Sequence, residues 1–325
     1  MAVNISYGTN DGSHTGDSLF ENCLNSMCQT GKTVIAVATG NEGSAGHHFH
    51  AQLSGGATET VEFVCAGNPN VVYMTIWKNF VDIVSFELIS PQGRSSGILE
   101  PPNDRLSVVM DGVRVTMRYG QPTHYSVEQE VYLFMESDKV ALQSGIWKMI
   151  ARCRTAVDGS LNIWLPTLED VSTSVTFLNP EPENTLTIPS TVQNVLSVGG
   201  YNSAFGSFAV FSGRGTGPPV LKPDLTAPAV NVLAPRSGGG YDTYTGTSMA
   251  APFVCGAAAL VMEWGIVHGN DPFLYGQKIK AFLRRGAQRA ANTVYPSTQW
   301  GYGRLWLCDT MEALSENLSG KELID

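Results

Sequence analysis

The segment 2–40 alternates strand, helix and strand, and this alternation limits the fold more than any other feature of the sequence. Residues 2–6 (AVNIS) resemble a buried strand, and residues 15–31 (TGDSLFENCLNSMCQTG) place apolar side chains at helical spacing as far as Gly31. Residues 33–40 (TVIAVATG) form a continuous apolar, β-branched run, typical of a strand covered on both faces. Two strands joined by one helix over so short a distance predict a right-handed parallel crossover.

From about residue 52 to residue 183 the pattern changes to short alternating runs such as TVEFVCA (60–66) and GIWKMIARC (145–153), separated by turn residues. Many short strands at regular spacing are typical of an antiparallel β-sandwich. From about residue 184 the parallel pattern returns. We therefore expect an α/β domain, residues 1–51 and 184–325, with helices flanking a parallel sheet. A jelly-roll-like β-sandwich at 52–183 interrupts it, because loops tolerate long insertions at small thermodynamic cost.

Composition excludes some classes of partner. The 325 residues are 43% hydrophobic, enough to bury a sizeable core. A net charge of -9 with no run of Lys or Arg argues against nucleic acid, whose binding depends on clustered basic residues. The longest apolar stretch, 250–264, contains Pro252 and Gly256 and is shorter than the roughly 20 residues that a bilayer span needs. We expect a core helix there and no membrane partner.

The cysteines and the N-terminal residues carry little information on targeting. The six cysteines lack both the regular spacing of a disulfide framework and the paired spacing of a zinc site, so we expect mostly free thiols and a reducing compartment. Residues 1–10 (MAVNISYGTN) have neither the basic nor the long apolar region of a signal peptide. They resemble the middle of a domain, because a strand is followed at once by a Gly-containing loop.

Ser248 lies among small residues in the string GTSMAAP (246–252), where an apolar helix begins. Small neighbours would let a substrate backbone approach, and a helix N-terminus carries partial positive charge. Because proline is tolerated in the first turn of a helix, Pro252 predicts a helix start close to it. Two interpretations follow: Ser248 is an ordinary cap of a buried helix, or it is a nucleophile.

The full string GTSMAAP resembles the nucleophile segment of the subtilisin-like serine peptidases, the subtilases, and the resemblance implies that role for Ser248. The string AVATGNEG (36–43) resembles the segment whose asparagine amide stabilises the oxyanion, which implies Asn41. Considered alone, Asn41 would be a turn residue at a strand end. A side-chain donor aimed at a developing oxyanion contributes about 3–4 kcal/mol, a value taken from this same family.

Further strings resemble the substrate-binding parts of subtilases. NISYG (4–8) is similar to the strand that pairs with the bound peptide, so Ser6, Tyr7 and Gly8 would form one wall of the primary specificity pocket. Ala38, Thr39 and Gly40 would form the facing wall. The strings FSGRG (211–215), KPDLTAP (222–228) and GYGRL (301–305) extend the resemblance over everything outside the insertion. With a β-sandwich between the oxyanion and nucleophile segments, the chain is most similar to clostridial-type subtilases.

The catalytic base is not identifiable in this sequence. The subtilase triad runs Asp, His, Ser along the chain, and the first two lie upstream of the strand that residues 2–6 match. None of the six histidines has a context like HGTH. The resemblance therefore implies that an N-terminal fragment outside this chain supplies Asp and His. His47, His48 and His50 are interpreted as loop residues and not as metal ligands, because no carboxylate or cysteine cluster lies nearby.

Two functions follow from the resemblance. The first is a serine endopeptidase acting on peptide or protein substrates, without a cofactor; calcium, common in the family, has no evident acidic ligand cluster here. The alternative is a catalytically inactive pseudoprotease with a binding or regulatory role, for example in spore germination. Tyr7 and Glu42 flank the expected pocket and favour a polar or restricted site.

Overall fold

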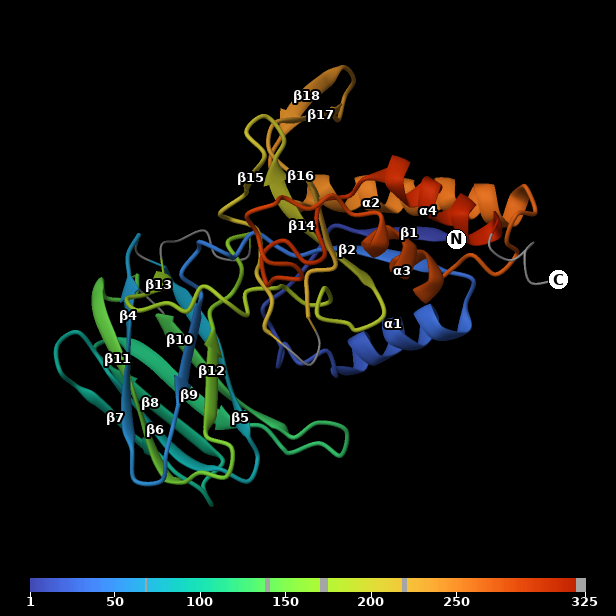
Figure 1. The fold of residues 1–325 in the computed structure, drawn as a ribbon. Helices are drawn as coiled ribbons and strands as arrows, with labels where there is room; N and C mark the ends of the chain where they lie inside the picture. The colour runs from blue at the N-terminus through green and yellow to red at the C-terminus, as the bar shows by residue number, and fades with distance from the viewer. Residues whose placement is uncertain (68, 138–140, 170–174, 218–220, 320–325) are drawn as a thin grey trace. The chain divides into compact units, whose positions relative to one another are not determined.

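A computed structural model describes residues 1–67, 69–137, 141–169, 175–217 and 221–319. The chain folds into two compact units (Figure 1). Unit 1 comprises Met1–Gly8, His14–Ser44 and Glu183–Asp325, and unit 2 comprises Thr9–Ser13 and Ala45–Pro182. Unit 2 thus includes residues 45–51, which the sequence pattern assigned to the α/β domain.

The sheet of unit 1 is mostly parallel. Its five strands are β1 (Ala2–Ile5), β2 (Val34–Ala38), β14 (Leu196–Asn202), β15 (Ser207–Phe208) and β16 (Leu225–Pro228). They lie in the order β1-β2-β14-β15, with β16 also pairing with β14; only β15 is antiparallel to its neighbour. Helix α1 (Leu19–Thr30) begins with a capping box between Ser18 and Glu21 and ends before Gly31. The predicted strand–helix–strand crossover of residues 2–40 is therefore confirmed.

Two helices cover opposite faces of this sheet, because side chains alternate along β2. Val34, Ala36 and Ala38 pack in one core cluster with helix α2 (Thr247–Met262). Ile35 and Val37 pack with α1 instead. The α2 helix continues into a π-helical turn, η1 (Glu263–Val267), and is followed by α3 (Gln277–Arg285) and α4 (Leu307–Ser319). Strands β17 (Val232–Pro235) and β18 (Tyr241–Tyr244) form a separate hairpin.

The apolar stretch at Thr247–Val267 is the one helix, within the described residues, that is long and apolar enough to cross a membrane. One of its faces is occupied by the sheet. Ala250, Val254, Ala258 and Val261 are buried in the core cluster, and α2 contacts β1, β2, β14 and β16. This packing is that of the core helix predicted from the sequence.

Unit 2 contains two antiparallel sheets. One has the order β3-β12-β5-β10-β9-β8 and the other β13-β4-β11-β6-β7. The strands are β3 (His48–Gln52), β4 (Thr58–Cys65), β5 (Val71–Asn79), β6 (Ile83–Ile89), β7 (Ser95–Leu99), β8 (Arg105–Met110), β9 (Val113–Tyr119), β10 (Glu128–Ser137), β11 (Gly145–Thr155), β12 (Ser160–Trp164) and β13 (Val175–Phe177). Alternate side chains of both sheets, among them Phe63, Phe86, Trp147 and Ile163, form one hydrophobic core.

All six cysteines are free thiols, as their scattered spacing predicts. Cys28, Cys65 and Cys153 are buried, and burial raises the pKa of the Cys65 thiol to about 12. A thiol in such surroundings packs as a small apolar group and does not act as a nucleophile.

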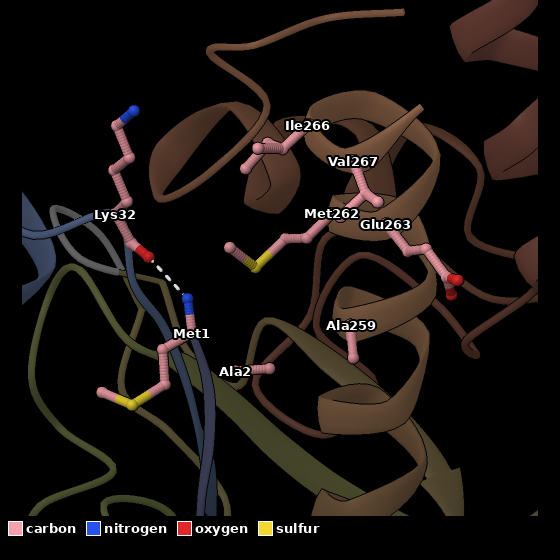
Figure 2. A pocket seen from close by; sticks show the side chains of 8 residues that line it. All are labelled: Met1, Ala2, Lys32, Ala259, Met262, Glu263, Ile266 and Val267. Carbon is pink, nitrogen blue, oxygen red and sulfur yellow. Dashed lines mark hydrogen bonds between the residues drawn. The ribbon is translucent and has the colours of Figure 1, made fainter. Parts of the chain in front are cut away.

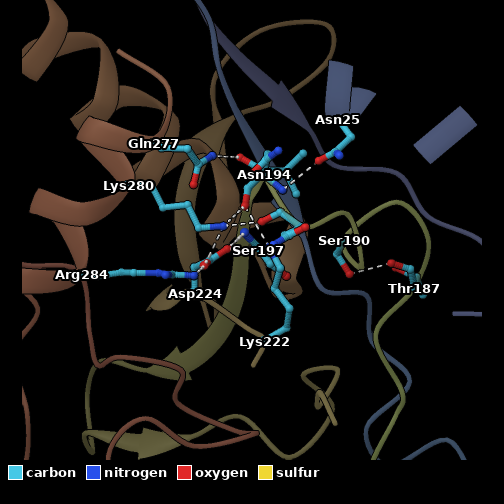
Figure 3. A network of polar contacts seen from close by, with 12 residues as sticks. Asn25, Thr187, Ser190, Asn194, Ser197, Lys222, Asp224, Gln277, Lys280 and Arg284 are labelled. Carbon is cyan, nitrogen blue, oxygen red and sulfur yellow. Dashed lines mark hydrogen bonds and ion pairs between the residues drawn. The ribbon is translucent and has the colours of Figure 1, made fainter. Parts of the chain in front are cut away.

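A buried charge cluster joins β14, β16 and α3 in unit 1 (Figure 3). The Asp224 carboxylate is fully buried; it lies 2.8 Å from Lys222 Nζ and 3.1 Å from Lys280 Nζ, and it also contacts Arg284. It accepts a hydrogen bond of 2.7 Å from the Ser197 N–H. Burial alone would raise the pKa of this carboxyl, but the three cations outweigh burial and hold the pKa well below its ordinary value of 3.8.

We predict that Asp224→Asn lowers the free energy of unfolding by about 3–5 kcal/mol, because it leaves buried cations without their counter-charge. Urea denaturation measures this loss. Glu316→Gln is the control: Glu316 pairs with Arg285 at 3.0 Å, but both side chains are more than half exposed, so the change should cost less than about 1 kcal/mol. Equal losses in the two variants would contradict the prediction.

The same carboxyl makes stability depend on pH. Its folded-state pKa lies below its unfolded-state value of 3.8, so its contribution is complete above that value. The contribution is lost as the pH falls through the folded-state pKa. The unfolding free energy of the parent should therefore fall more steeply in acid than that of Asp224→Asn.

Candidate active site

The parallel pairing of β1 and β2 brings two predicted site segments to one edge of the sheet. Ile5 pairs with Val37, so residues 6–8 and 39–41 both follow the carboxyl ends of neighbouring strands. Helix α2 begins at the same place, since Ser248 is hydrogen-bonded to Ser6. The carboxyl edge of a parallel sheet is where open α/β proteins commonly bind ligands.

Ser6 and Ser248 are connected by two hydrogen bonds between segments that are 242 residues apart. The Ser6 hydroxyl donates to the Ser248 carbonyl oxygen at 3.0 Å, and the Ser248 hydroxyl donates to the Ser6 carbonyl oxygen at a longer 3.4 Å. Ser248 is half-buried, so its hydroxyl remains accessible. The end of β1 therefore fixes the position of the candidate nucleophile.

Pro252 explains why the Ser248 carbonyl needs a hydrogen-bond donor from outside the helix, which Ser6 provides. Because α2 begins at Thr247, Pro252 lies in its second turn, and the sequence-based placement of Pro252 in the first turn was wrong. Proline has no N–H, so it leaves the carbonyl of the residue four positions earlier, Ser248, without its intrahelical donor. The Ser6 hydroxyl supplies the missing hydrogen bond and so compensates for the proline.

Asn41 acts as the cap of α2. The helix begins after Gly246, which has no side chain to accept a hydrogen bond. Asn41 Oδ1 accepts from the Thr247 N–H at 3.0 Å and from the Thr247 hydroxyl at 3.2 Å, which is the role of an N-cap side chain. With Oδ1 directed at Thr247, next to Ser248, the orientation of the Asn41 amide is fixed. The structure therefore places the two predicted catalytic residues side by side.

The residues predicted to line the specificity pocket would line it with their backbone more than with their side chains. The Tyr7 side chain is 74% exposed, Ala38 belongs to the core cluster, and the Thr39 hydroxyl lies 3.3 Å from the Ser212 hydroxyl. Gly8 and Gly40 instead lie against a residue that sequence reasoning missed, Thr187.

Thr187 belongs to the segment TLTIPS (185–190), which begins just after the expected insertion and carries no motif that points to a pocket. Its N–H donates to the Thr39 carbonyl at 3.0 Å. A Cβ added to Gly8 would lie 2.7 Å from Thr187 Cβ, and one added to Gly40 would lie 2.6 Å from Thr187 Oγ1. The sequence indicated this contact only indirectly. Gly8 and Gly40 follow strand ends, and because they have no side chains they let a third segment approach closely.

The histidines lie in other environments. His14 is buried, with Nδ1 2.7 Å from the Leu186 carbonyl oxygen. In unit 2, His48 Nε2 lies 3.0 Å from Asn162 Oδ1 and the ring stacks on Trp164. Within the described residues, no group of three His, Cys, Asp or Glu side chains is arranged to hold a metal ion.

Comparison with known proteins identifies the family of the chain. The model of the subtilase family matches residues 173–303. Subtilisin from Bacillus pumilus is 39% identical over 80 residues. The chain belongs to the subtilase family, and unit 1 has the subtilisin-like α/β fold.

A solved structure covers nearly the whole chain. The CspB protease of Clostridium perfringens is 38% identical, with a TM-score of 0.90 over 97% of this chain. The PII-type proteinase of Lactococcus lactis subsp. cremoris is 30% identical over 114 residues. The chain spans 66% of the CspB structure, 27% of the Bacillus pumilus subtilisin and 6% of the PII-type proteinase.

The close approach of Thr187 to Gly8 gives a test of the site's packing. Gly8→Ala should lower the free energy of unfolding by about 1–3 kcal/mol, because the new methyl group overlaps Thr187. Adding Thr187→Gly should recover part of that loss. Gly217→Ala is the control: a Cβ there meets nothing within 4 Å, so a change within about 0.5 kcal/mol is expected. Equal effects of the two alanines in urea denaturation would refute the packing described.

Proposed function

We propose that this chain is the nucleophile-bearing part of a serine endopeptidase. The observation that carries the proposal is the placement of Ser248 and Asn41: both are held at the start of α2 by hydrogen bonds to backbone groups. An accessible hydroxyl beside a fixed amide, at the N-terminus of a helix, is what acyl transfer requires.

In the proposed mechanism, Ser248 Oγ attacks the carbonyl carbon of a peptide bond and its proton passes to a base. Negative charge develops on the former carbonyl oxygen. The Ser248 N–H lies in the first turn of α2, where N–H groups have no intrahelical acceptor, and it would donate to that oxygen. Asn41 Oδ1 faces Thr247, so the other terminal atom of this side chain, the amide nitrogen Nδ2, is left to act as the second donor to the same oxygen. Collapse of the tetrahedral intermediate releases the amine and leaves an acyl-enzyme, which water hydrolyses.

The base is proposed to come from a segment outside this chain. Among the described residues, the hydrogen-bond acceptor of the Ser248 hydroxyl is the Ser6 carbonyl and not an imidazole. A general base must lie within hydrogen-bond reach of the proton it removes. We therefore assign the catalytic His and Asp to an N-terminal fragment that binds this chain.

The open edge of β1 is the proposed binding place of that fragment. Within the described residues β1 pairs with β2 alone, so one side of the strand has unpaired backbone groups. At the start of β1 lies a hollow of about 530 Å³ between this strand and the end of α2 (Figure 2). It is lined mainly by apolar residues: Met1, Ala2, Lys32, Ala259, Met262, Glu263, Ile266 and Val267. Further strands beside β1 would bury this surface.

We also propose that unit 2 is an insertion with its own fold. Its two antiparallel sheets and single core fit a jelly-roll-like β-sandwich, and because β3 pairs with β12 the proposed insertion begins near residue 45 and not at the residue 52 expected from the sequence. The β-sandwich would then be added to the subtilase domain without contributing to its parallel sheet.

One observation supports the alternative function, a pseudoprotease with a binding or regulatory role. The Ser248 hydroxyl already has a backbone acceptor, so its position does not depend on a catalytic histidine. A chain that kept this geometry without the other two triad residues would keep the arrangement of Ser6, Asn41 and Ser248 and lose the chemistry.

Labelling by a fluorophosphonate probe distinguishes the two functions. Full-length protein that includes the N-terminal fragment should be labelled at Ser248, because only an assembled triad activates the hydroxyl. Ser248→Ala should abolish labelling, and the 1–325 chain alone should be labelled far more slowly. Absence of labelling in folded full-length protein would favour the pseudoprotease.

Asn41→Ala should reduce kcat about 10²- to 10³-fold with little change in KM, since the lost donor acts mainly on the transition state; this range comes from the corresponding donor of another subtilase. Because Asn41 also caps α2, Asn41→Asp is the matched variant: it keeps the acceptor for Thr247 and removes the donor. Asn41→Asp should keep the fold and lose activity. Full activity in Asn41→Asp would contradict the oxyanion role.

A further inference from the structure

A small polar pocket of unit 1 lies at the edge of the sheet opposite the candidate active site. Residues 193 and 194 precede β14, and residues 221 and 222 precede β16, so the pocket lies at the amino ends of these parallel strands. Its volume is about 170 Å³, several times the roughly 30 Å³ that one water molecule occupies in the liquid. Among the described residues that line it there is no aspartate or glutamate, and its polar residues include Asn194, Lys222, Gln277, Lys280, Arg284 and Tyr302.

Positive charge is in excess beside this pocket. Three cations contact the single carboxylate of Asp224 (Figure 3), and they are Lys222, Lys280 and Arg284. The two lysine side chains are only 3% and 4% exposed, and buried charge is costly unless opposite charge balances it. From this geometry we propose that the pocket binds a small oxyanion, inorganic phosphate or sulfate, which supplies the missing negative charge. The inference does not depend on the proposed endopeptidase function.

Arg284 provides hydrogen-bond donors for such an ion. One of its terminal nitrogens contacts Asp224, and its guanidinium lies over the Tyr302 ring, 4.3 Å from the centroid. Among the described residues, Arg284 Nε is buried and has no hydrogen-bond partner. Because a guanidinium carries donors on all three nitrogens, this side chain can hold Asp224 and an oxyanion together. Lys222 Nζ donates to the Asp224 carboxylate at 2.8 Å and to the Val195 carbonyl at 2.9 Å, which uses two of its three N–H groups.

The Lys280 ammonium is expected to respond to the bound ion. Burial lowers its pKa to about 7; Asp224 opposes this shift, and the Lys222 and Arg284 cations increase it. The buried Cys28 thiol of α1 is also near, but burial raises its pKa, so it stays neutral and does not offset the cations. A bound anion favours the charged ammonium and raises the pKa of Lys280. Binding should therefore take up protons near neutral pH, and the affinity should fall as the pH rises above that pKa.

The test is a calorimetric titration of sodium sulfate into full-length protein, with sodium chloride added to keep the ionic strength constant. The parent should bind sulfate saturably. Arg284→Gln should weaken binding about 10- to 100-fold, the contribution expected of a hydrogen bond to a charged group. Arg285→Gln is the matched control. It removes the same charge from the next residue, but Arg285 is more than half exposed and pairs with Glu316, so the affinity should not change.

A second variant separates binding in the pocket from a change in folding. Gln277→Glu places a carboxylate in the lining at an exposed position, so it should keep the circular dichroism spectrum and abolish sulfate binding. In the parent, sulfate should bind more tightly at about pH 6 than at about pH 8, because Lys280 titrates in that range and sulfate does not. Phosphate titrated under the same conditions identifies the preferred ion: tighter binding than that of sulfate assigns the pocket to phosphate, and weaker binding assigns it to sulfate.

Three results would overturn the proposal. The first is a parent that does not bind either ion saturably. The second is an equal affinity for sulfate in Arg284→Gln and Arg285→Gln, and the third is an unchanged affinity in folded Gln277→Glu.

Discussion

The contact between the end of β1 and the start of α2 is the constraint on which the rest of the site depends. Ser6 donates to the Ser248 carbonyl, which Pro252 has deprived of its helical donor. A proline in the second turn of a helix would ordinarily destabilise it, but here the freed carbonyl is the point of attachment for a neighbouring strand. Pro252 thus accounts both for the carbonyl left without a helical donor and for the strand contact that positions the candidate nucleophile Ser248.

A second consequence concerns Asn41. Since Gly246 cannot cap α2, the helix takes its cap from the loop after β2, and this choice orients the amide beside Ser248. Capping the helix and orienting the proposed oxyanion donor are therefore one interaction. The buried carboxylate of Asp224 keeps α3 against β14 and β16 in the same unit, and so holds the sheet from which the site is built.

The strands and the helix of residues 2–40 could be predicted because the spacing of apolar residues within each element can be read from a short stretch of sequence. The apolar run 33–40 and the helical spacing of 15–31 each report burial of one element, and both elements are found where expected. Ser248 and Asn41 were predicted because the strings GTSMAAP (246–252) and AVATGNEG (36–43) resemble segments of the subtilases. Thr187 was not, because its role depends on Gly8 and Gly40, which are distant in sequence and carry no side chain to signal a contact. The second-turn position of Pro252 was not predicted for a related reason: its compensation by Ser6 is a tertiary hydrogen bond.

The central claim is that Ser248 and Asn41 act together on one carbonyl group. A crystal structure of the full-length protein with a peptide aldehyde tests it most directly. The account predicts a covalent bond from Ser248 Oγ to the aldehyde carbon, with the resulting oxygen within hydrogen-bond distance of Asn41 Nδ2 and the Ser248 N–H. An aldehyde bound without reaction, or a hemiacetal oxygen directed away from Asn41, would contradict it.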